Sequence, residues 1–281
     1  MEKLKNLKLP KLKKMKKSKK KVRKKEKNKI NKLELKDNHL IAIWGSPGSG
    51  KTTLAVKTAK ELAEKKKNVI ILHDDVFCPT IPILLPNIKD IDKSLGRIFA
   101  NPTIDQETIL DNSITVKNYD YIALIGHQKG ENPFTYPEYT KERVIDLLIL
   151  LRHLVDYIIV DCSSILTESI LTITALELAD KVIRLSTADF KGLSYFKSTL
   201  PLLMDQKFKS EEHLRVISNT KDFQGIEVVN DVLRGSSIFL PNTLEIEEQY
   251  VEARLFESIR DKNSIKYKNE LEKIMGVVFY E

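Results

Sequence analysis

The sequence predicts a three-layer α/β fold, in which a mostly parallel central sheet is covered by helices on both faces. Short apolar runs rich in β-branched residues alternate with longer segments of helical periodicity along most of the chain. This alternation is typical of parallel sheets that are buried on both sides. The first strand and the first helix are separated by a glycine-rich stretch, GSPGSGKTT.

Seven strands are expected, each a short apolar run. In chain order they cover residues 41–44, 69–72, 121–125, 157–160, 181–185, 214–218 and 237–240. Five helices are expected between them, at residues 52–65, 140–153, 170–179, 190–204 and 226–233. The first helix shows the spacing clearly, because Leu54, Ala55, Ala59 and Leu62 recur at helical intervals.

The segment 79–116 is the least regular part of the chain. It contains prolines at positions 79, 82, 86 and 102, and we expect a helix there only at 104–111. We interpret this segment as an insertion within one domain. The later stretches 246–259 and 267–275 have helical periodicity and are expected to pack against the body of that domain.

The glycine-rich stretch has the spacing of a phosphate-binding loop, Gly-x-x-x-x-Gly-Lys-Thr. In such a loop, backbone N–H groups and the start of the next helix converge on an anion, and a lysine reaches the terminal phosphates. The threonine is expected to bind Mg²⁺ through its hydroxyl. A glycine turn without a ligand is the alternative, which the preceding strand and following helix disfavour. The predicted nucleotide-binding residues are Gly45, Ser46, Pro47, Gly48, Ser49, Gly50, Lys51, Thr52 and Thr53.

Composition favours an intracellular globular protein. Hydrophobic residues make up 42% of the 281 residues, which is enough for a sizeable core. The two cysteines, Cys78 and Cys162, are too few for a disulfide framework or a zinc cluster, and we expect a cytoplasmic location. The N-terminus lacks the apolar region of a signal peptide, and the chain has no run of 18 apolar residues.

Charge divides the chain into two parts. Residues 1–37 carry a net charge of +14, whereas the remainder carries −6. We predict a disordered polybasic tail at 1–37, followed by a nucleotide-binding domain at 38–281. Such a tail suits an anionic membrane surface, on which its apolar residues would share a helical face, and equally suits non-specific binding to DNA or RNA. A lysine tract that only aids solubility is the alternative.

Three later stretches also carry recognisable patterns, namely ILHDDVFCPTI, VDYIIVDCSS and LRVISNTK. Together with the loop, they resemble the MinD/ParA (SIMIBI) class of P-loop ATPases over roughly residues 38–260. The first is similar to the second-strand motif of that class, Asp-x-Asp followed by Pro. The second resembles its Walker B strand. The third resembles the late strand after which an asparagine reads the adenine edge, since an amide can donate and accept at once.

The resemblance implies a role for several residues. Asp161 would hold Mg²⁺ together with Thr52. Asp75 would position the attacking water and act as a catalytic residue beside Lys51, and Asn219 would contact adenine. The implied cofactors are ATP and Mg²⁺, and the implied assembly is a homodimer.

Each of these roles has an alternative. Aspartate and asparagine commonly cap turns or helices after strands, which would explain Asp161, Asp75 and Asn219 without a ligand. If the alignment shifts by one residue, Asp74 takes the place of Asp75. His73 stands where the first aspartate of the second-strand motif usually lies.

Two departures from the family pattern bear on hydrolysis. Ser46 stands where these proteins usually carry a lysine that reaches across a dimer, and a serine cannot supply positive charge to a phosphoryl transition state. Ser163 and Ser164 follow Asp161 in place of the usual prolines or switch glycine. The loop therefore indicates nucleotide binding more strongly than hydrolysis. The absence of lysine at this position also resembles the CpaE/TadZ branch of the class, which places the pilus machinery at a particular site in the cell.

The leading hypothesis is a ParA/MinD-like ATP-binding switch with slow or impaired ATPase activity. It would position a partner complex, either a pilus or secretion assembly or the partition machinery of a mobile element, at a membrane or nucleoid surface. The partner protein is not identified by the sequence. A small-molecule or nucleoside kinase is the alternative, in which the stretch HDDVF supplies a base to a substrate hydroxyl. A third hypothesis is an inactive scaffold that holds nucleotide for stability alone.

Overall fold

The computed structural model describes residues 39–221, 224, 230–231, 235–236 and 238–279. The predicted tail at 1–37 lies outside these residues, as does most of the helix expected at 226–233. The strands are β1 (His39–Gly45), β2 (Val69–His73), β3 (Ile114–Val116), β4 (Tyr119–Ile125), β5 (Tyr157–Asp161), β6 (Lys181–Thr187), β7 (Leu214–Thr220) and β8 (Ile238–Pro241). The α-helices are α2 (Lys51–Glu64), α3 (Ile81–Leu84), α4 (Leu95–Ala100), α5 (Gln106–Asp111), α6 (Lys141–Leu154), α7 (Ile170–Leu178), α8 (Phe190–Thr199), α10 (Leu244–Val251) and α11 (Ile265–Phe279).

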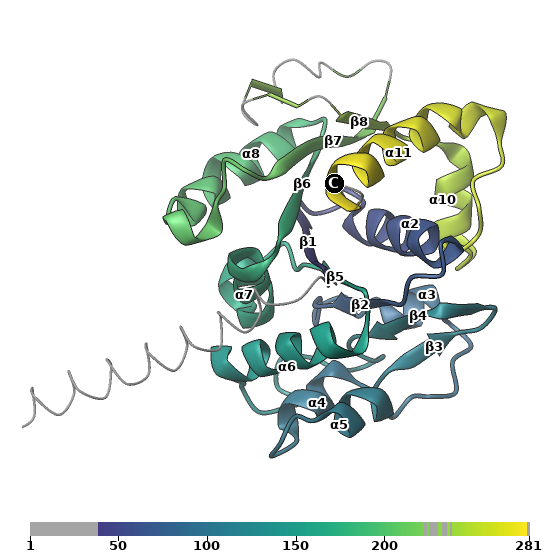
Figure 1. The fold of residues 1–281 in the computed structure, drawn as a ribbon. Helices are drawn as coiled ribbons and strands as arrows, with labels where there is room; N and C mark the ends of the chain where they lie inside the picture. Colours follow the sequence, from purple (N-terminus) through teal and green to yellow (C-terminus); the bar gives the residue numbers. More distant parts are fainter. Residues whose placement is uncertain (1–38, 222–223, 225–229, 232–234, 237, 280–281) are drawn as a thin grey trace, which may run out of the picture. The chain divides into compact units, whose positions relative to one another are not determined.

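In the described part of the chain, eight strands form one sheet in the order β3-β4-β2-β5-β1-β6-β7-β8. Every neighbouring pair is parallel except β3 and β4, which are antiparallel. Helices α2, α10 and α11 lie on one face, and α6, α7 and α8 lie on the other (Figure 1). The predicted three-layer α/β class is therefore confirmed.

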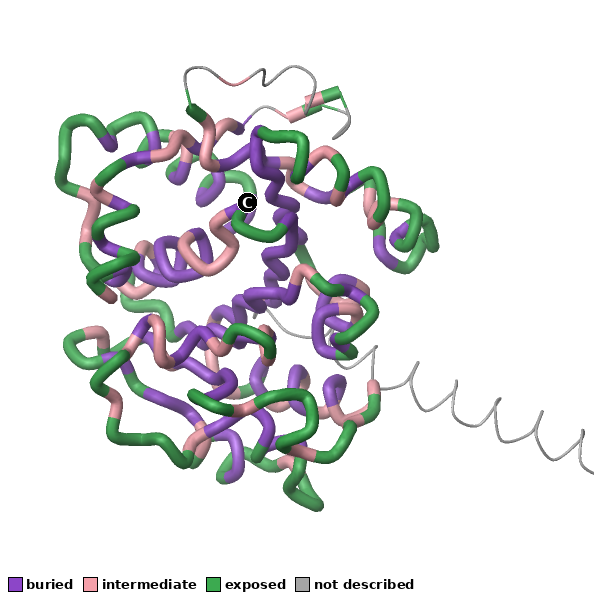
Figure 2. Tube along the Cα trace, turned by 180° about the vertical axis from the view of Figure 1, so that it is seen from behind, coloured by how far each residue is buried: buried purple, intermediate pink, exposed green. Residues whose placement is uncertain are grey.

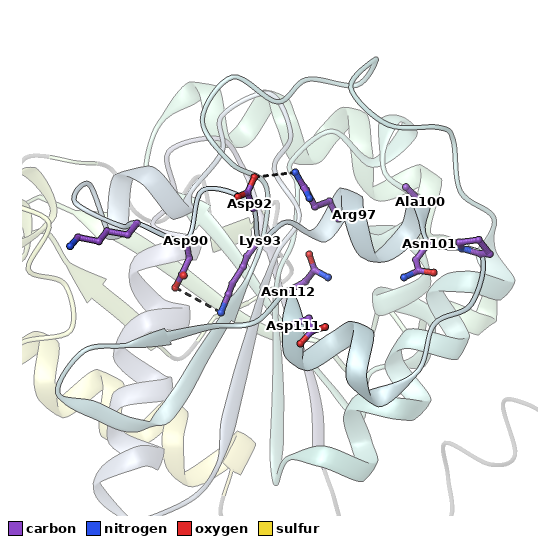
Figure 3. A pocket seen from close by; sticks show the side chains of 10 residues that line it. Asp90, Asp92, Lys93, Arg97, Ala100, Asn101, Asp111 and Asn112 are labelled. Atoms are coloured by element: carbon purple, nitrogen blue, oxygen red, sulfur yellow. Dashed lines mark hydrogen bonds and ion pairs between the residues drawn. The ribbon is translucent and has the colours of Figure 1, made fainter.

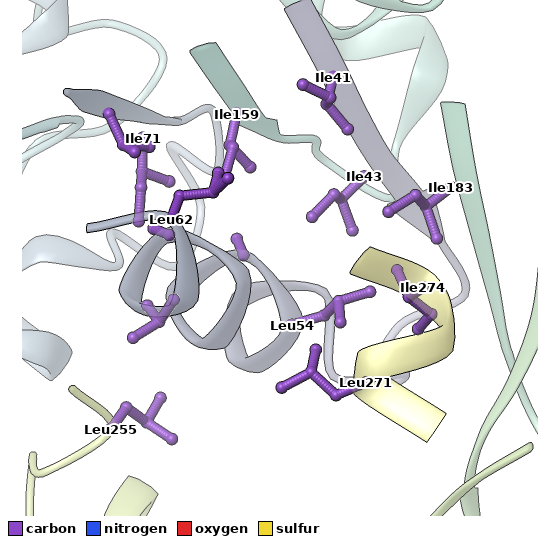
Figure 4. Packing of buried hydrophobic residues seen from close by; sticks show 14 of the residues in the cluster. Ile41, Ile43, Leu54, Leu62, Ile71, Ile159, Ile183, Leu255, Leu271 and Ile274 are labelled. Atoms are coloured by element: carbon purple, nitrogen blue, oxygen red, sulfur yellow. The ribbon is translucent and has the colours of Figure 1, made fainter. Parts of the chain in front are cut away.

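Burial is continuous along the central strands, because helices cover both faces of the sheet. Residues of β1, β2 and β5 are buried on both faces, so the middle of the sheet is covered throughout (Figure 2). Ile41 and Ile43 of β1 face α2, where they join one apolar cluster with Leu54 and Leu62 (Figure 4). Trp44 belongs to the opposite face and packs edge-on against Phe196 of α8, with 5.4 Å between ring centroids. None of the helices in the described part of the chain combines the length and apolar character needed to cross a bilayer.

The segment 79–116 is more regular than the sequence indicates. It contains α3, α4 and α5, and then β3, which adds an antiparallel edge to the sheet. The expected helix at 104–111 is confirmed as α5, which Asp105 caps by accepting a hydrogen bond from the Thr108 N–H at 2.8 Å. Ser94 caps α4 in the same way through Gly96. Periodicity does not reveal such elements, because α3, α4 and β3 each span six residues or fewer.

Two helices are shorter than predicted. The helix expected at 190–204 ends at Thr199 and continues as the 3₁₀ turn η2 (Leu200–Leu203). Pro201 explains the change, because proline has no N–H for an intrahelical bond and disfavours a helical residue before it. The helix expected at 246–259 ends at Val251. The chain after it does not continue as helix but runs as an irregular segment along α2.

A buried lysine holds this irregular segment in place. Lys57 of α2 is only 2% exposed, and its Nζ donates to Leu255 O at 2.7 Å and Glu257 O at 2.8 Å. A third bond goes to the side-chain carbonyl of Gln249 in α10. Burial, together with the nearby charge of Lys60, lowers the pKa of Lys57 to about 8. The ammonium therefore joins α2 to the C-terminal segment with all three protons in use.

Replacing Lys57 should measure the strength of this connection. We expect Lys57→Met to lower the free energy of unfolding by about 2–4 kcal/mol, because three acceptors, two of them buried, lose their donor. Urea unfolding followed by circular dichroism gives the difference. Lys67→Met, at an exposed position after the same helix, is the control and should change stability by less than about 0.5 kcal/mol. Equal stabilities of the two variants would contradict the assignment.

Candidate nucleotide-binding site

The glycine-rich loop connects the end of β1 to the start of α2, as the motif predicts. Gly48 and Gly50 adopt positive φ angles of 73° and 79°, a left-handed conformation that glycine tolerates best. Gly45 lies so close to β6 that a Cβ atom there would stand 2.0 Å from the Leu185 carbonyl oxygen. The adjoining Ser46 N–H donates to that same oxygen at 3.0 Å. The loop therefore needs glycine at these places for its backbone path.

The start of α2 is suited to an anion. Gly50 precedes the helix, no side chain caps its first turn, and that turn holds no acidic residue. The first N–H groups of a helix have no intrahelical partner, and the helix dipole adds positive potential there. Lys51, Thr52 and Thr53 line a cavity of about 610 Å³ at this point. A phosphate group is the ligand that such a helix start favours.

Thr52 and Asp161 meet beside the loop. The pairing of β1 with β5 sets Ile43 opposite Asp161, and the Thr52 Oγ1 hydroxyl donates to Asp161 Oδ2 at 2.6 Å. Because the hydroxyl gives its one proton to the carboxylate, its lone pairs remain available to a cation. A hydroxyl and a carboxylate are hard oxygen ligands of the kind that Mg²⁺ prefers. These two residues therefore fit the metal role that was expected of them.

Lys51 lies beside Thr52 at the start of α2, and its hydrogen-bond partners are neutral. Its Nζ donates to Ser164 Oγ at 2.6 Å and to Ser46 O at 3.4 Å. Burial lowers the pKa of Lys51, although the charge of Asp161 opposes that shift. A half-buried ammonium whose hydrogen bonds go to a hydroxyl and a carbonyl, and not to a carboxylate, keeps its positive charge available for an anion.

Comparison with known protein families finds a match that includes the residues of this site. A family model described as an AAA domain matches residues 39–216, which include the loop, Thr52 and Asp161. The chain belongs to the AAA domain family. No curated protein matches the sequence significantly.

Solved structures share the fold of this AAA domain. MinD of Pyrococcus furiosus superposes with a TM-score of 0.63 at 16% identity, covering 84% of this chain and 98% of that one. A ParA family ATPase from Chlorobium tepidum gives 0.64 at 15%, covering 84% and 98%. A putative plasmid partition protein from Borrelia burgdorferi, bound to AMPPNP, gives 0.60 at 19%, covering 86% and 100%. The likeness to MinD and ParA ATPases is therefore confirmed at the level of the fold.

Two aspartates at the end of β2 lie in different surroundings in the AAA domain. Asp74 is buried and accepts hydrogen bonds from the Ser169 and Thr172 hydroxyls near the start of α7. Burial raises the pKa of Asp74 to about 6, and these two hydrogen bonds oppose the rise. Asp75 lines the cavity, and its Oδ1 accepts from the N–H groups of Phe77 at 3.0 Å and Cys78 at 2.8 Å. Asp75 thus lies at the cavity and also caps a turn. Asp74 joins the end of β2 to the start of α7 through hydrogen bonds.

Asn219 lies at the cavity in the left-handed conformation, which asparagine adopts more readily than most other residues. Its φ angle is +53°, and its Nδ2 donates to Gly48 O at 2.8 Å. The preceding Ser218 donates through Oγ to Ser49 O at 2.6 Å. The end of β7 therefore holds the loop by hydrogen bonds to its carbonyl groups. The contact of Asn219 with adenine stays a prediction.

The first part of the predicted site does not line the cavity. Gly48 through Thr53 line it, whereas Gly45, Ser46 and Pro47 do not. Ser46 is fully buried and points toward β6, where its Oγ accepts from the Thr187 N–H at 3.2 Å. The serine at the family's lysine position therefore anchors the loop to the sheet.

Sequence reasoning missed the opposite wall of the cavity. It is formed by the end of β8 and by α10, which contribute Leu240, Thr243, Ile246 and Tyr250. The only signal was the apolar spacing of the C-terminal stretch, which indicates a core helix equally well. Ser164 departs from the family pattern, and the sequence does not reveal its contact with Lys51.

A second cavity, of about 700 Å³, lies in the segment 79–116 (Figure 3). Four of its charged side chains form two ion pairs, Asp92 with Arg97 at 3.2 Å and Asp90 with Lys93 at 3.8 Å. It shares no residue with the glycine-rich loop. The 610 Å³ cavity is therefore the one that carries the expected chemistry.

Two glycine substitutions with opposite expected effects test the loop geometry. Gly45→Ala should lower the free energy of unfolding by about 2–3 kcal/mol, because its Cβ would collide with the Leu185 carbonyl of β6. Gly276→Ala, in α11 with no atom within 4 Å of the added Cβ, should raise it by about 0.5–1 kcal/mol. Chemical denaturation of both variants and the wild type measures the two shifts. A stable Gly45→Ala protein would refute the close approach of β1 and β6.

Proposed function

We propose that this AAA domain protein is an ATP-binding switch of the MinD/ParA type, with Mg²⁺ as its metal cofactor. The observation that carries the proposal is the Thr52–Asp161 contact of 2.6 Å, which lies next to Lys51 at the uncapped start of α2. Hydroxyl, carboxylate, ammonium and free helix N–H groups together suit a metal-bound triphosphate better than any neutral ligand.

Each part of the site would take one role in binding. The N–H groups of residues 48–53 would hold the phosphates, and the Lys51 ammonium would exchange the Ser164 hydroxyl for a phosphate oxygen. Thr52 and Asp161 would hold Mg²⁺, which lowers the negative charge that the phosphates present to the protein. Asp75 would orient the attacking water at the cavity rim, and Asn219 would contact adenine beside the loop.

Hydrolysis is proposed to be slow or impaired. Ser46 is buried against Thr187 and has no charge, so it cannot stabilise the equatorial oxygens of a phosphoryl transition state. The loss of such a cationic group typically costs about 10³-fold or more in rate. A slow ATPase suits a switch, because the bound state then persists long enough to be read by a partner.

The switch itself would lie in the chain that follows β5. Ser164 donates to Gly45 O at 2.9 Å and accepts from Lys51, so it ties this segment to the loop. Further along, Ser169 and Thr172 hold Asp74 at the end of β2. A ligand that takes the Lys51 ammonium away from Ser164 would therefore alter a connected set of polar contacts.

The biological role is proposed by likeness to fold relatives. A similar structure from Aquifex aeolicus is a complex of the cell-division proteins MinC and MinD. For this chain we propose a homodimer that positions a partner complex, either a pilus or secretion assembly of the CpaE/TadZ kind or the partition machinery of a mobile element. Residues 1–37, with their charge of +14, would bind an anionic membrane surface or DNA in the cytoplasm.

A small-molecule or nucleoside kinase is the second candidate. The position of Asp75 on the cavity wall favours it, because a carboxylate there would accept a proton from a substrate hydroxyl. Consumption of ATP only in the presence of an added acceptor, with a phosphorylated product, would identify the kinase. ATP turnover without an acceptor would identify the switch.

Nucleotide binding is the first test. Isothermal titration calorimetry of the full chain should show ATP binding that tightens with Mg²⁺. Lys51→Ala should weaken this binding about 10–100-fold, because an ion-paired hydrogen bond to phosphate is lost. Lys67→Ala, at an exposed position outside the site, should bind as the wild type does. Absence of heat with ATP, ADP and GTP in the presence of Mg²⁺ would sink the proposed function.

Surface binding is the second test. Sedimentation with anionic vesicles or with double-stranded DNA should depend on the nucleotide added, and should fall as salt is raised. A variant in which half of the lysines of residues 1–37 are replaced by glutamine should lose most of this binding and keep its affinity for ATP. Equal sedimentation with ATP, with ADP and without nucleotide would remove the switch from the proposal.

A further inference from the structure

A histidine lies directly beside the carboxylate of the expected metal site. The parallel pairing of β2 with β5 sets His73 opposite Asp161, at the ends of the two strands. The His73 Nδ1 atom is 2.9 Å from Asp161 Oδ2, and the histidine side chain is fully buried. The same oxygen accepts the Thr52 hydroxyl proton at 2.6 Å. Two side chains from different elements therefore bind one carboxylate oxygen.

The proton positions follow from the chemistry of these groups. An ionised carboxylate only accepts hydrogen bonds, so Nδ1 of His73 must carry its proton when Asp161 is charged. With both recorded hydrogen bonds ending on Oδ2, the carboxylate is fixed in rotation about its Cβ–Cγ bond. A carboxylate held in this way presents Oδ1 in one orientation. Outer-shell hydrogen bonds of this kind orient metal-side groups in many proteins and raise metal affinity.

Packing alone does not explain a histidine at this place. On the same face of β2, the preceding positions are the apolar residues Val69 and Ile71. The Nε2 atom of His73 is buried and has no hydrogen-bond partner among the described residues, which is unfavourable for folding. An apolar side chain would avoid that cost. The gain from a histidine at this position is the hydrogen bond between Nδ1 and Asp161.

The chain after β4 packs closely against the base of the His73 side chain. At the end of β4, Gly126 lies so near that a Cβ atom there would stand 3.0 Å from the His73 Cβ and 3.3 Å from its carbonyl oxygen. The glycine lets the chain after β4 pack against His73. This close approach restricts the backbone and Cβ of His73, from which the ring reaches Asp161.

We propose that His73 is a positioning residue for Mg²⁺-dependent nucleotide binding. It donates its Nδ1 proton to Asp161 and holds that carboxylate, together with Thr52, in the orientation that the metal side of the site requires. His73 itself touches neither the nucleotide nor the metal. Its role rests on the Mg²⁺–nucleotide site proposed above, and the experiment below separates the two.

Three substitutions at one position isolate the donor. His73→Asn keeps an N–H at the place of Nδ1, and His73→Leu has the same shape without a donor. His73→Gln moves the N–H to the place of Nε2. The affinity for a fluorescent ATP analogue is measured for each full-length variant, once with EDTA and once over a series of Mg²⁺ concentrations. Thermal unfolding of each variant reports its stability separately.

The expected result concerns the metal dependence alone. His73→Leu and His73→Gln should need about 10-fold more Mg²⁺ for half of the gain in affinity, since loss of an outer-shell partner typically costs 10–100-fold in metal affinity. His73→Asn should stay within about threefold of the wild type. Binding with EDTA should be equal in all four proteins. If His73→Leu does not fold, the contrast between His73→Asn and His73→Gln still decides the matter.

Two other results would overturn the role of His73. One is an unchanged Mg²⁺ requirement in His73→Leu and His73→Gln. The other is an equal loss of affinity with EDTA and with Mg²⁺, which would mean a purely structural residue. Asp161→Asn serves as the reference, because it should abolish the Mg²⁺ effect. If the wild type binds no nucleotide, or if Asp161→Asn keeps the full Mg²⁺ effect, the proposed function fails first and His73 loses its role with it.

Discussion

The parallel pairing of β1 with β5 is the constraint on which the rest of the site depends. Its register sets Asp161 opposite Ile43 and so brings the carboxylate to the Thr52 hydroxyl, although 109 positions separate the two residues. Parallel strands end at one edge of a sheet, and β2 and β7 therefore deliver His73 and Asn219 to the same edge. A shift of one residue would turn every side chain of a strand to the other layer, so the two buried faces of the sheet hold this register.

The loop receives its shape from the strands beneath it. Gly45 passes so close to the Leu185 carbonyl that no side chain fits between them. Ser218 and Asn219, at the end of β7, donate to loop carbonyls at 2.6 Å and 2.8 Å. A backbone held in this way needs little ordering when a ligand arrives, which lowers the entropic cost of binding. Buried packing and ligand recognition are therefore properties of the same short segment.

The two aspartates that follow β2 show a limit of prediction from sequence patterns. Both Asp74 and Asp75 fit a motif of acidic residues after a strand, and the spacing alone leaves either alignment open. The structure separates them, because their side chains leave the chain just after β2 in different directions. Asp74 enters the layer of α7, whereas Asp75 reaches the cavity. His73 is a similar case, since only the pairing of two distant strands shows that its ring meets Asp161.

The sequence by itself determined the α/β class, most of the strands and the phosphate-binding loop. These depend on local patterns, namely apolar runs, helical spacing and glycines at fixed intervals, which are visible without any long-range contact. It did not determine the short elements of segment 79–116, the ends of α8 and α10, or the inward turn of Ser46. Only the tertiary structure decided those, and it decided which polar side chains meet at the sheet edge, because strand order and register join residues far apart in the chain.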